Sequence, residues 1–277
     1  MASAAQSLTR PFLVRLTPQI ALLLLFGAAA AAVTIIRADG RWDMPGTMGY
    51  ALPAFMGMWA LMMAGMMLPS VAPFASMYSR TVTERRIPRL ALFAAGYLAV
   101  WSLMGIPAFG LARLADEFAG GDRGTVLAVV AFAACGIYQL TPLKYRCLTH
   151  CRTPMSHLLK FASHRGRLRD LRSGFEHGYF CAACCWGLMM LLVVFGVMNV
   201  PAMILLAAVV ATEKIWRWGE RFSRAVGVAA LAAAVLVVWV PELAPGLTNE
   251  PMDAMAADSM AEGDSMMDGE SMGDSMK

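Results

Sequence analysis

The chain has 277 residues, of which 58% are hydrophobic and only 15% are charged, and its formal net charge is +4. A soluble domain carries about 25% charged residues, so this composition excludes an ordinary soluble domain and favours a membrane protein. The charge is uneven, since the last 29 residues carry −7 and the rest carry +11. A basic surface of this kind suits anionic lipid and requires no nucleic acid.

Five windows without a charged residue follow in chain order, and each is near or above the roughly 20 residues that one membrane-spanning helix needs. They are Pro18–Ile36, Ala51–Ser79, Leu90–Ala112, Gly124–Leu143 and Gly178–Thr212. The fifth is too long for one span and contains Asn199 and Pro201, which favour a turn, so we expect two helices there. A last apolar run, Ala225–Pro241, predicts a seventh helix, and no alternating pattern typical of a barrel is present. The sequence predicts an all-α polytopic membrane protein: a domain of about seven transmembrane helices over residues 1–243, then a disordered tail over residues 244–277.

The basic residues predict how these helices are oriented. Eighteen of the 23 Lys and Arg residues lie before the first helix or directly after the second, fourth and sixth helices. Because cytoplasmic loops are rich in Lys and Arg, we expect a cytoplasmic N-terminus and a periplasmic C-terminus in a bacterial inner membrane. The alternative for the first helix is a cleaved signal peptide, since two arginines and an apolar core precede a run of alanines from Ala28. Cleavage would leave every later loop on the same side.

The tail from Asn249 repeats Asp/Glu-Ser-Met four times and contains seven Met but no aromatic or β-branched residue. Such a segment cannot bury a core. Thioether sulfur selects Cu(I), and carboxylates help to recruit cations. We therefore interpret the tail as a segment that captures copper outside the cell membrane, with solubility as the alternative role of its composition.

The second predicted helix contains MGMWALMMAGMMLPS, whose methionines form two parallel rows on one broad face. The rows are Met58, Met62 and Met66, and Met63 and Met67. Methionine is also a common filler in helix packing, and a row alone is more often core than site. Two further methionines, Met44 and Met48, precede this helix on the predicted outer loop. Together with the tail they favour a role of the first row in metal binding.

Five cysteines and two histidines lie near the predicted cytoplasmic face. They are Cys147, His150 and Cys151 after the fourth helix, and His177, Cys181, Cys184 and Cys185 at the start of the fifth. If the fifth helix already includes His177, then Cys181 and Cys185 follow it on one stripe, and one helical turn would present the first group together. Short Cys pairs with a nearby His are the spacing of thiolate–imidazole metal sites. We predict one metal site from both groups, holding copper or, alternatively, zinc. The other alternative is that these cysteines pack as small apolar residues.

The remaining candidates are interpreted as structural. Cys135 lies in the middle of a helix and is expected to pack there, while His157 and His164 lie in a basic loop and are expected to be solvated. Glu213 and Lys214 are adjacent near the inner end of the sixth helix, and we interpret them as a local ion pair at the membrane surface. No phosphate loop, nucleophile elbow or zinc-protease motif indicates catalysis.

Several short segments together carry a resemblance to a known family. They are MGMWALMMAGMMLPS, YQLTPLKYRCLTHC, CAACCWGLMM, GVMN and the Glu-Lys dipeptide, in this order from about Met44 to Trp218. In this combination the chain resembles an uncharacterised prokaryotic family of predicted metal-binding integral membrane proteins. The resemblance implies a polytopic helical membrane protein with a metal site and supplies no established substrate or reaction. Where that family has Gly in the cysteine motif, this chain has Ala182 and Ala183, which leaves the thiols intact.

The leading hypothesis from the sequence is a membrane protein that passes Cu(I) between an external Met-rich surface and a cytoplasmic-side Cys/His site. Its expected partners are the metal ion, the lipid bilayer, and a periplasmic metal carrier or a membrane complex. Two alternatives stay open. One is a metal-dependent membrane redox protein or enzyme, and the other is a structural subunit of a larger membrane complex.

Overall fold

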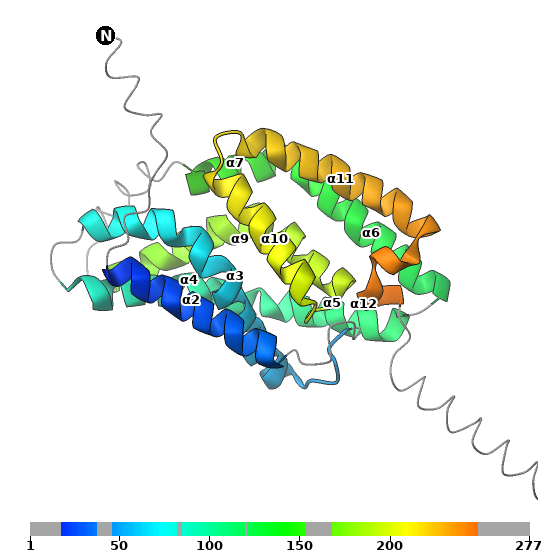
Figure 1. The fold of residues 1–277 in the computed structure, drawn as a ribbon, viewed down its shortest axis with the longest axis horizontal. Helices are drawn as coiled ribbons and strands as arrows, with labels where there is room; N and C mark the ends of the chain where they lie inside the picture. The colour runs from blue at the N-terminus through cyan, green and yellow to red at the C-terminus, as the bar shows by residue number, and fades with distance from the viewer. Residues whose placement is uncertain (1–17, 38–45, 82–84, 120, 153–167, 249–277) are drawn as a thin grey trace, which may run out of the picture.

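The computed structural model describes residues 18–37, 46–81, 85–119, 121–152 and 168–248 (Figure 1). Within these ranges the long regular elements are all α-helices and none is a strand, as the sequence predicts. The helices are α2 (Pro18–Arg37), α3 (Leu52–Thr81), α4 (Arg86–Leu103), α5 (Gly105–Phe118), α6 (Gly121–Leu140), α7 (Pro142–Arg152), α9 (Arg169–Phe195), α10 (Val200–Ile215), α11 (Gly219–Trp239), the 3-10 turn η2 (Pro241–Leu243) and α12 (Pro245–Thr248).

Five helical segments of the described chain are long and apolar enough to cross a membrane. They are Leu52–Tyr78, Arg86–Phe118, Gly121–Leu140, Arg169–Phe195 and Gly219–Trp239. The second of these joins α4 and α5, which meet at Met104, so the third predicted helix extends beyond its charge-free window. The first and sixth predicted spans correspond to α2 and to α10, and α10 has only 16 residues. The count of seven spans therefore stays a prediction.

The break that the sequence predicts within the fifth window is confirmed. The Asn199 side chain accepts a hydrogen bond from the Ala202 N–H at 3.0 Å and donates one to the Phe195 carbonyl at 3.1 Å. Asn199 thus caps the start of α10 while bonding back to the end of α9. Gly196 has a φ of +94°, a conformation open to glycine and to few other residues. Pro201 fits the first turn of α10, where no N–H donor is needed.

The thiol-bearing helix α9 lies in the interior of the bundle, and 67% of its most apolar stretch of 18 residues is buried. α4 packs along it through two glycines. A Cβ atom added at Gly174 would lie 2.0 Å from the Phe93 carbonyl oxygen, and one added at Gly96 would lie 2.1 Å from that of Leu171. Only residues without a side chain permit this close approach. α2 lies along α3 and α6 lies along α11, so two further helix pairs flank the central one (Figure 1).

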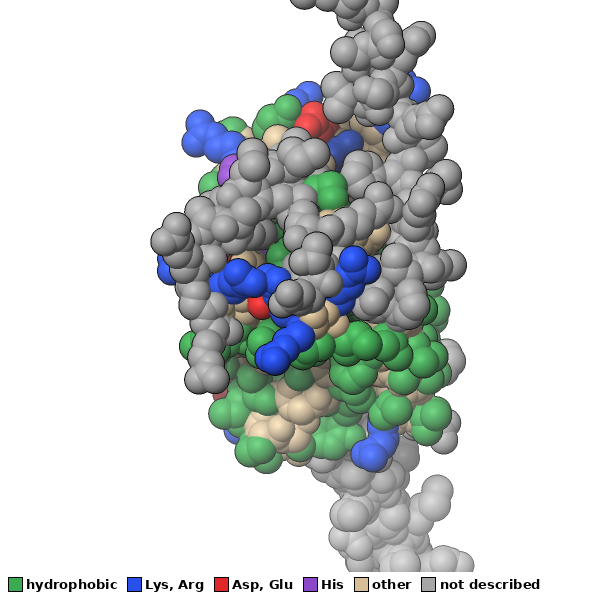
Figure 2. Space-filling view, turned by 90° about the vertical axis from the view of Figure 1, so that its left-hand side faces the viewer, with side chains coloured by type: hydrophobic (Ala, Val, Ile, Leu, Met, Phe, Trp, Pro, Cys, Tyr) green, Lys and Arg blue, Asp and Glu red, His purple; other side chains and the backbone are tan. Residues whose placement is uncertain are grey.

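Contacts between helix ends bring the basic segments together. The Tyr78 hydroxyl at the end of α3 donates a hydrogen bond to Asp170 at the start of α9, and Arg89 of α4 pairs with the same carboxylate at 2.9 Å. Arg152 of α7 donates to the Glu213 carbonyl near the end of α10 at 3.1 Å. On the face in Figure 2, Lys and Arg side chains gather beside a surface of hydrophobic side chains. Within the described residues, the segment after the fourth helix therefore contacts the segments after the second and after the sixth, and the side that they face stays a prediction.

The folded chain extends past the predicted start of the tail. Ala244 is 0% exposed and Leu247 is 1% exposed, and α12 packs against α5, α6 and α9. A Cβ atom added at Gly124 would lie 2.0 Å from the Leu247 carbonyl oxygen, so this contact is close. Met44, His157, His164 and the Met-rich segment 249–277 lie outside the described residues.

Candidate metal centre

α9 carries three cysteines in the interior of the bundle. Because the helix begins at Arg169, His177, Cys181 and Cys185 follow one another at single-turn spacing on one stripe, as predicted. Cys181, Cys184 and Cys185 are each 1% exposed. The thiols of Cys184 and Cys185 donate hydrogen bonds to the Cys181 carbonyl at 3.1 Å and 2.9 Å. Three sulfur atoms thus lie within one helical turn and away from water.

The short helix α7 brings two more thiols to α9. Cys147 and Cys151 are one turn apart on α7, and the Cys151 Sγ lies 3.8 Å from the Cys184 Sγ. Hydrogen bonding with Cys181 and Cys184 raises the pKa of the Cys151 thiol well above its usual value, and burial raises the pKa of Cys147. Both α7 residues are therefore thiols near neutral pH, and a metal that binds them must displace a proton.

Polar side chains from three other places in the bundle surround the Cys181 sulfur. The Lys214 ammonium of α10 donates to the Cys181 Sγ at 3.0 Å and to the Ser70 hydroxyl of α3 at 3.2 Å. The Tyr97 hydroxyl of α4 lies 3.0 Å from the same sulfur. Ser70 in turn donates to the Met67 carbonyl at 2.8 Å. Cys181 is therefore the point where α3, α4, α9 and α10 meet through polar contacts.

The two histidines of the predicted site lie in different surroundings. His177 is 5% exposed, and its ring stacks on Phe74 with 4.1 Å between the ring centroids. His150 is exposed, and its ring stacks on Phe180 at 4.6 Å while its Nδ1 lies 3.1 Å from the Arg146 carbonyl oxygen. The stacking accounts for both ring positions, and the role of either histidine as a metal ligand stays a prediction.

The methionine rows of α3 are divided between the core and one end of the bundle. The buried ones are Met62, Met63 and Met67, each 0% exposed, and Met66, 7% exposed. Met58 is half-buried and, with Met48 of the preceding loop, packs against Met198 and Val200 in a small cluster, which Met48 connects to the main core. α3 therefore extends from this cluster at Met58 to Ser70 beside Cys181, a distance of about 18 Å along the helix axis.

Sulfur dominates the donor atoms that the fold brings together. Within the described ranges, no group of three or more His, Cys, Asp and Glu side chains is arranged so that it could hold a metal ion. The sulfur atoms of Cys151 and Cys184, from different helices, lie 3.8 Å apart, and Cys181 adds a third sulfur that interacts with Cys151. Soft thiol and thioether donors suit Cu(I) and Zn(II) and are poor ligands for Mg²⁺ or Ca²⁺.

Comparison with known proteins identifies the family. Residues 56–237 match the PpoB2 family, described as a copper chaperone. The chain belongs to this copper chaperone family. The matched range includes all six cysteines and both methionine rows of α3. No curated protein and no solved structure matches the chain.

In this copper chaperone family member, the prediction of a local Glu213–Lys214 ion pair is wrong. Glu213 accepts a hydrogen bond from Lys144 of α7 at 2.7 Å and one from Gln139 of α6 at 3.0 Å. Both charged side chains of the Lys144–Glu213 pair are 1% exposed. Lys214 is instead directed to Cys181. Successive side chains on a helix diverge by about 100°, so the two neighbours serve different sites.

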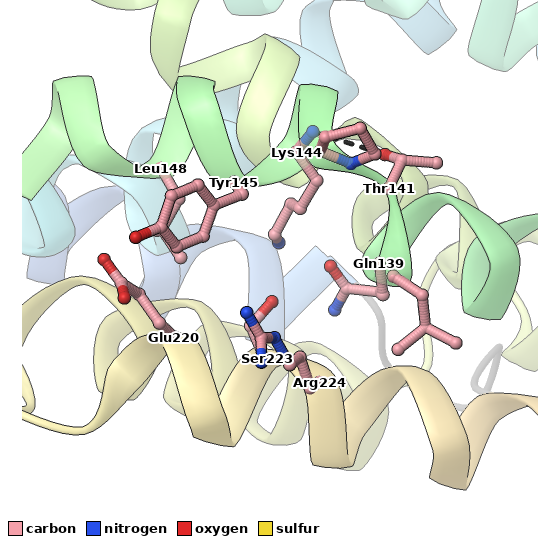
Figure 3. A pocket seen from close by; sticks show the side chains of 10 residues that line it. Gln139, Thr141, Lys144, Tyr145, Leu148, Glu220, Ser223 and Arg224 are labelled. Atoms are coloured by element: carbon pink, nitrogen blue, oxygen red, sulfur yellow. Dashed lines mark hydrogen bonds between the residues drawn. The ribbon is translucent and has the colours of Figure 1, made fainter.

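A pocket of about 280 Å³ lies beside the Lys144–Glu213 pair, between α7 and α11 (Figure 3). Lys144 and Gln139 extend into it from one wall, and Ser223 and Arg224 line the wall formed by α11. No cysteine is among the described residues that line it. The pocket is therefore distinct from the thiol cluster, although Lys144 belongs to both the pocket wall and the ion pair.

Four residues near the sulfur atoms were missed by the prediction from sequence. They are Ser70, Tyr97, Met198 and Lys214. A lysine at the end of an apolar segment is a functional candidate by its type alone, so Lys214 carried a usable signal. Met198 lies in the GVMN segment and could have been grouped with the α3 methionines. Nothing in the sequence distinguishes Ser70 or Tyr97 from ordinary packing residues.

Proposed function

We propose that the protein is an integral membrane copper chaperone that holds Cu(I) at the thiols of α7 and α9. The contact of 3.8 Å between Cys151 and Cys184 carries this proposal. The two cysteines belong to different helices and are 33 positions apart in the sequence. Their contact therefore results from the packing of α7 on α9 and is not part of a local sequence motif. Cys181 lies in the same cluster, and the family description supplies copper as the cargo.

The charge of Lys214 supports copper over zinc at these thiols. Cu(I) bound to two thiolates has one net negative charge, whereas Zn(II) bound to four has two. The Lys214 ammonium, 3.0 Å from the Cys181 sulfur, supplies one positive charge. In an apolar interior a charge that is not neutralised is costly, so the environment matches a Cu(I) dithiolate better.

The methionines of α3 provide a path from the predicted outer surface to the thiols. Met58, Met62 and Met66 are spaced by about 6 Å along the helix, and the next position in the row is Ser70. Ser70 contacts Lys214 beside Cys181. Cu(I) would move inward by exchange between neutral thioethers and would reach thiolates at the end, which bind it more strongly. The Met-rich tail would raise the copper concentration at the start of this path.

Copper analysis of the purified protein tests the role of the thiols. After loading with Cu(I) and washing with a moderate chelator, the unaltered chain should retain about one copper ion per thiol cluster. Cys184→Ser should lose most of this copper. Cys135→Ser is the matched control, because Cys135 is also buried, at 3% exposed, but lies on α6.

The outcomes separate the proposed role from its alternatives. If folded Cys184→Ser retains as much copper as the unaltered chain, the thiols are packing residues and the proposal is wrong. Zinc loading under the same conditions decides between the two metals. Steady turnover of a redox dye by the copper-loaded protein would favour a membrane redox enzyme instead.

A further inference from the structure

We propose that Met48, Met58 and Met198 form a thioether site that binds Cu(I) at the end of the bundle predicted to face outward. This inference rests on the proposed function and adds a defined first site for the metal. The three residues come from separate parts of the chain: the loop before α3, α3 itself, and the turn between α9 and α10. Met198 is 1% exposed, and with Val200 it forms a buried centre on which Met48 and Met58 pack.

The backbone at Met48 adopts a conformation that few side-chain-bearing residues take. Its φ is +54°, and within the described chain the only other residue of this kind apart from glycines is Arg85. Such a conformation costs of order 1–3 kcal/mol and persists only where the surrounding structure imposes it. Glycine or asparagine would be cheaper at this position. The presence of methionine therefore indicates a requirement for its side chain.

The loop that presents Met48 is anchored to α5. The Thr47 N–H and hydroxyl both donate to the Asp116 carboxylate, at 3.1 Å and 2.6 Å. Gly46 packs so closely that an added Cβ atom would lie 1.7 Å from an Asp116 oxygen. The Tyr50 N–H donates to the Thr47 carbonyl at 3.0 Å and closes the turn. Met48 is thus held in place before any ligand arrives.

The turn that presents Met198 is fixed as well. The Asn199 N–H donates to the Gly196 carbonyl at 3.0 Å, and the Asn199 side chain bonds to both flanking helices. Met58 is on the second turn of α3, whose backbone is regular. Three rigid segments therefore direct methionines into one small cluster, an arrangement that lowers the conformational cost of binding.

The chemistry of the cluster selects a soft monovalent ion. Thioethers are neutral, do not titrate and cannot form disulfides, so these donors depend neither on pH nor on the pairing of thiols. Three thioethers leave the charge of Cu(I) at +1, and the Asp116 carboxylate next to the loop provides a countercharge. Met48 and Met58 are half-buried, which gives an ion from solvent a way to the sulfur atoms. Simple packing needs neither this access nor the strained backbone.

Residue-resolved oxidation of the full chain tests the proposal. The probe is Ag(I), a redox-inert ion with the ligand preferences of Cu(I), and dilute hydrogen peroxide converts free thioethers to sulfoxides. At a free Ag(I) concentration ten times the dissociation constant, oxidation of Met48 and Met58 should slow by about 10-fold, because only the unbound fraction reacts. Peptide mass spectrometry reads each methionine separately, so the tail does not interfere. Alkylation of the cysteines in the same samples reports binding at the thiols.

The Met198→Leu variant should lose this protection at Met48 and Met58. Met203→Leu is the matched control, since Met203 is buried, at 5% exposed, in the main core near the start of α10. Protection that persists in Met198→Leu, or that is absent from the unaltered chain, overturns the site. Protected thiols with unprotected methionines would refute this site and leave the proposed function standing. Protected methionines with unprotected thiols would support the site and refute the thiol-based function.

Discussion

Removing the ammonium of Lys214 should weaken Cu(I) binding while leaving every proposed sulfur ligand in place. Lys214→Leu keeps an apolar side chain, adds no sulfur donor, and deletes the charge and the hydrogen bonds to Cys181 and Ser70, at 3.0 Å and 3.2 Å. A hydrogen bond to a charged group contributes about 1.5–3 kcal/mol. At about 1.4 kcal/mol per tenfold change, the dissociation constant for Cu(I) should rise by about 10- to 150-fold. Lys214→Arg keeps the charge and should show a smaller loss.

The measurement is a competition between detergent-solubilised protein and a chromogenic Cu(I) chelator under anaerobic conditions. Arg221→Leu is the matched control, because it also removes one positive charge, from a side chain of α11 that lies over the Trp218 ring at 4.2 Å. This control should bind Cu(I) as the unaltered chain does. If folded Lys214→Leu also binds Cu(I) with unchanged affinity, then Lys214 does not neutralise the metal site, and the charge argument for copper over zinc fails.

Three further predictions concern packing, the buried ion pair and the tail. Gly174→Ala places a Cβ atom 2.0 Å from the Phe93 carbonyl oxygen, so α4 and α9 must separate, and the free energy of unfolding should fall by about 1–3 kcal/mol in a thermal or denaturant assay. Glu213→Leu leaves the Lys144 ammonium buried without its carboxylate and should lower the free energy of unfolding by about 3–5 kcal/mol. Combining it with Lys144→Met should restore most of that stability. Equal losses in the single and the double variant would contradict the pairing. Deletion after Thr248 should lower the amount of copper captured at limiting copper and leave the copper that is retained after a chelator wash. If the retained copper is lost as well, the tight site lies in the tail.

The sequence predicts the helical framework well because the information is local. Charge-free windows locate the spans, and Asn199 with Pro201 marks the break between α9 and α10. The division of the third window into α4 and α5 was not predicted, although Gly105 and Pro107 are residues that favour a helix break there. The short helix α7 was anticipated only as one helical turn. Its full length depends on packing against α9, which no local pattern reports.

In the candidate site, contacts within one helix could be predicted from the sequence, whereas contacts between helices could not. Spacing on one helix predicts that His177, Cys181 and Cys185 share a stripe, since a period of about 3.6 residues fixes that geometry. The partner of each side chain on another helix depends on the rotation and register of both helices, which tertiary packing determines. Close approach at the Gly96–Gly174 crossing sets that register for α4, and so it places Tyr97 at the Cys181 sulfur.

The Glu213–Lys214 dipeptide shows that the partners of charged side chains also depend on tertiary packing. Read along the sequence, the two residues neutralise each other, and no other charge is needed. On a helix they diverge by about 100°, so each must find its own partner in an apolar interior. Glu213 finds Lys144, which leaves Lys214 with the sulfur of Cys181 and the hydroxyl of Ser70. The ion pair on α7 therefore has a consequence beyond stability: by engaging Glu213 it leaves the Lys214 ammonium available to the thiols, where the charge of a copper dithiolate would require it.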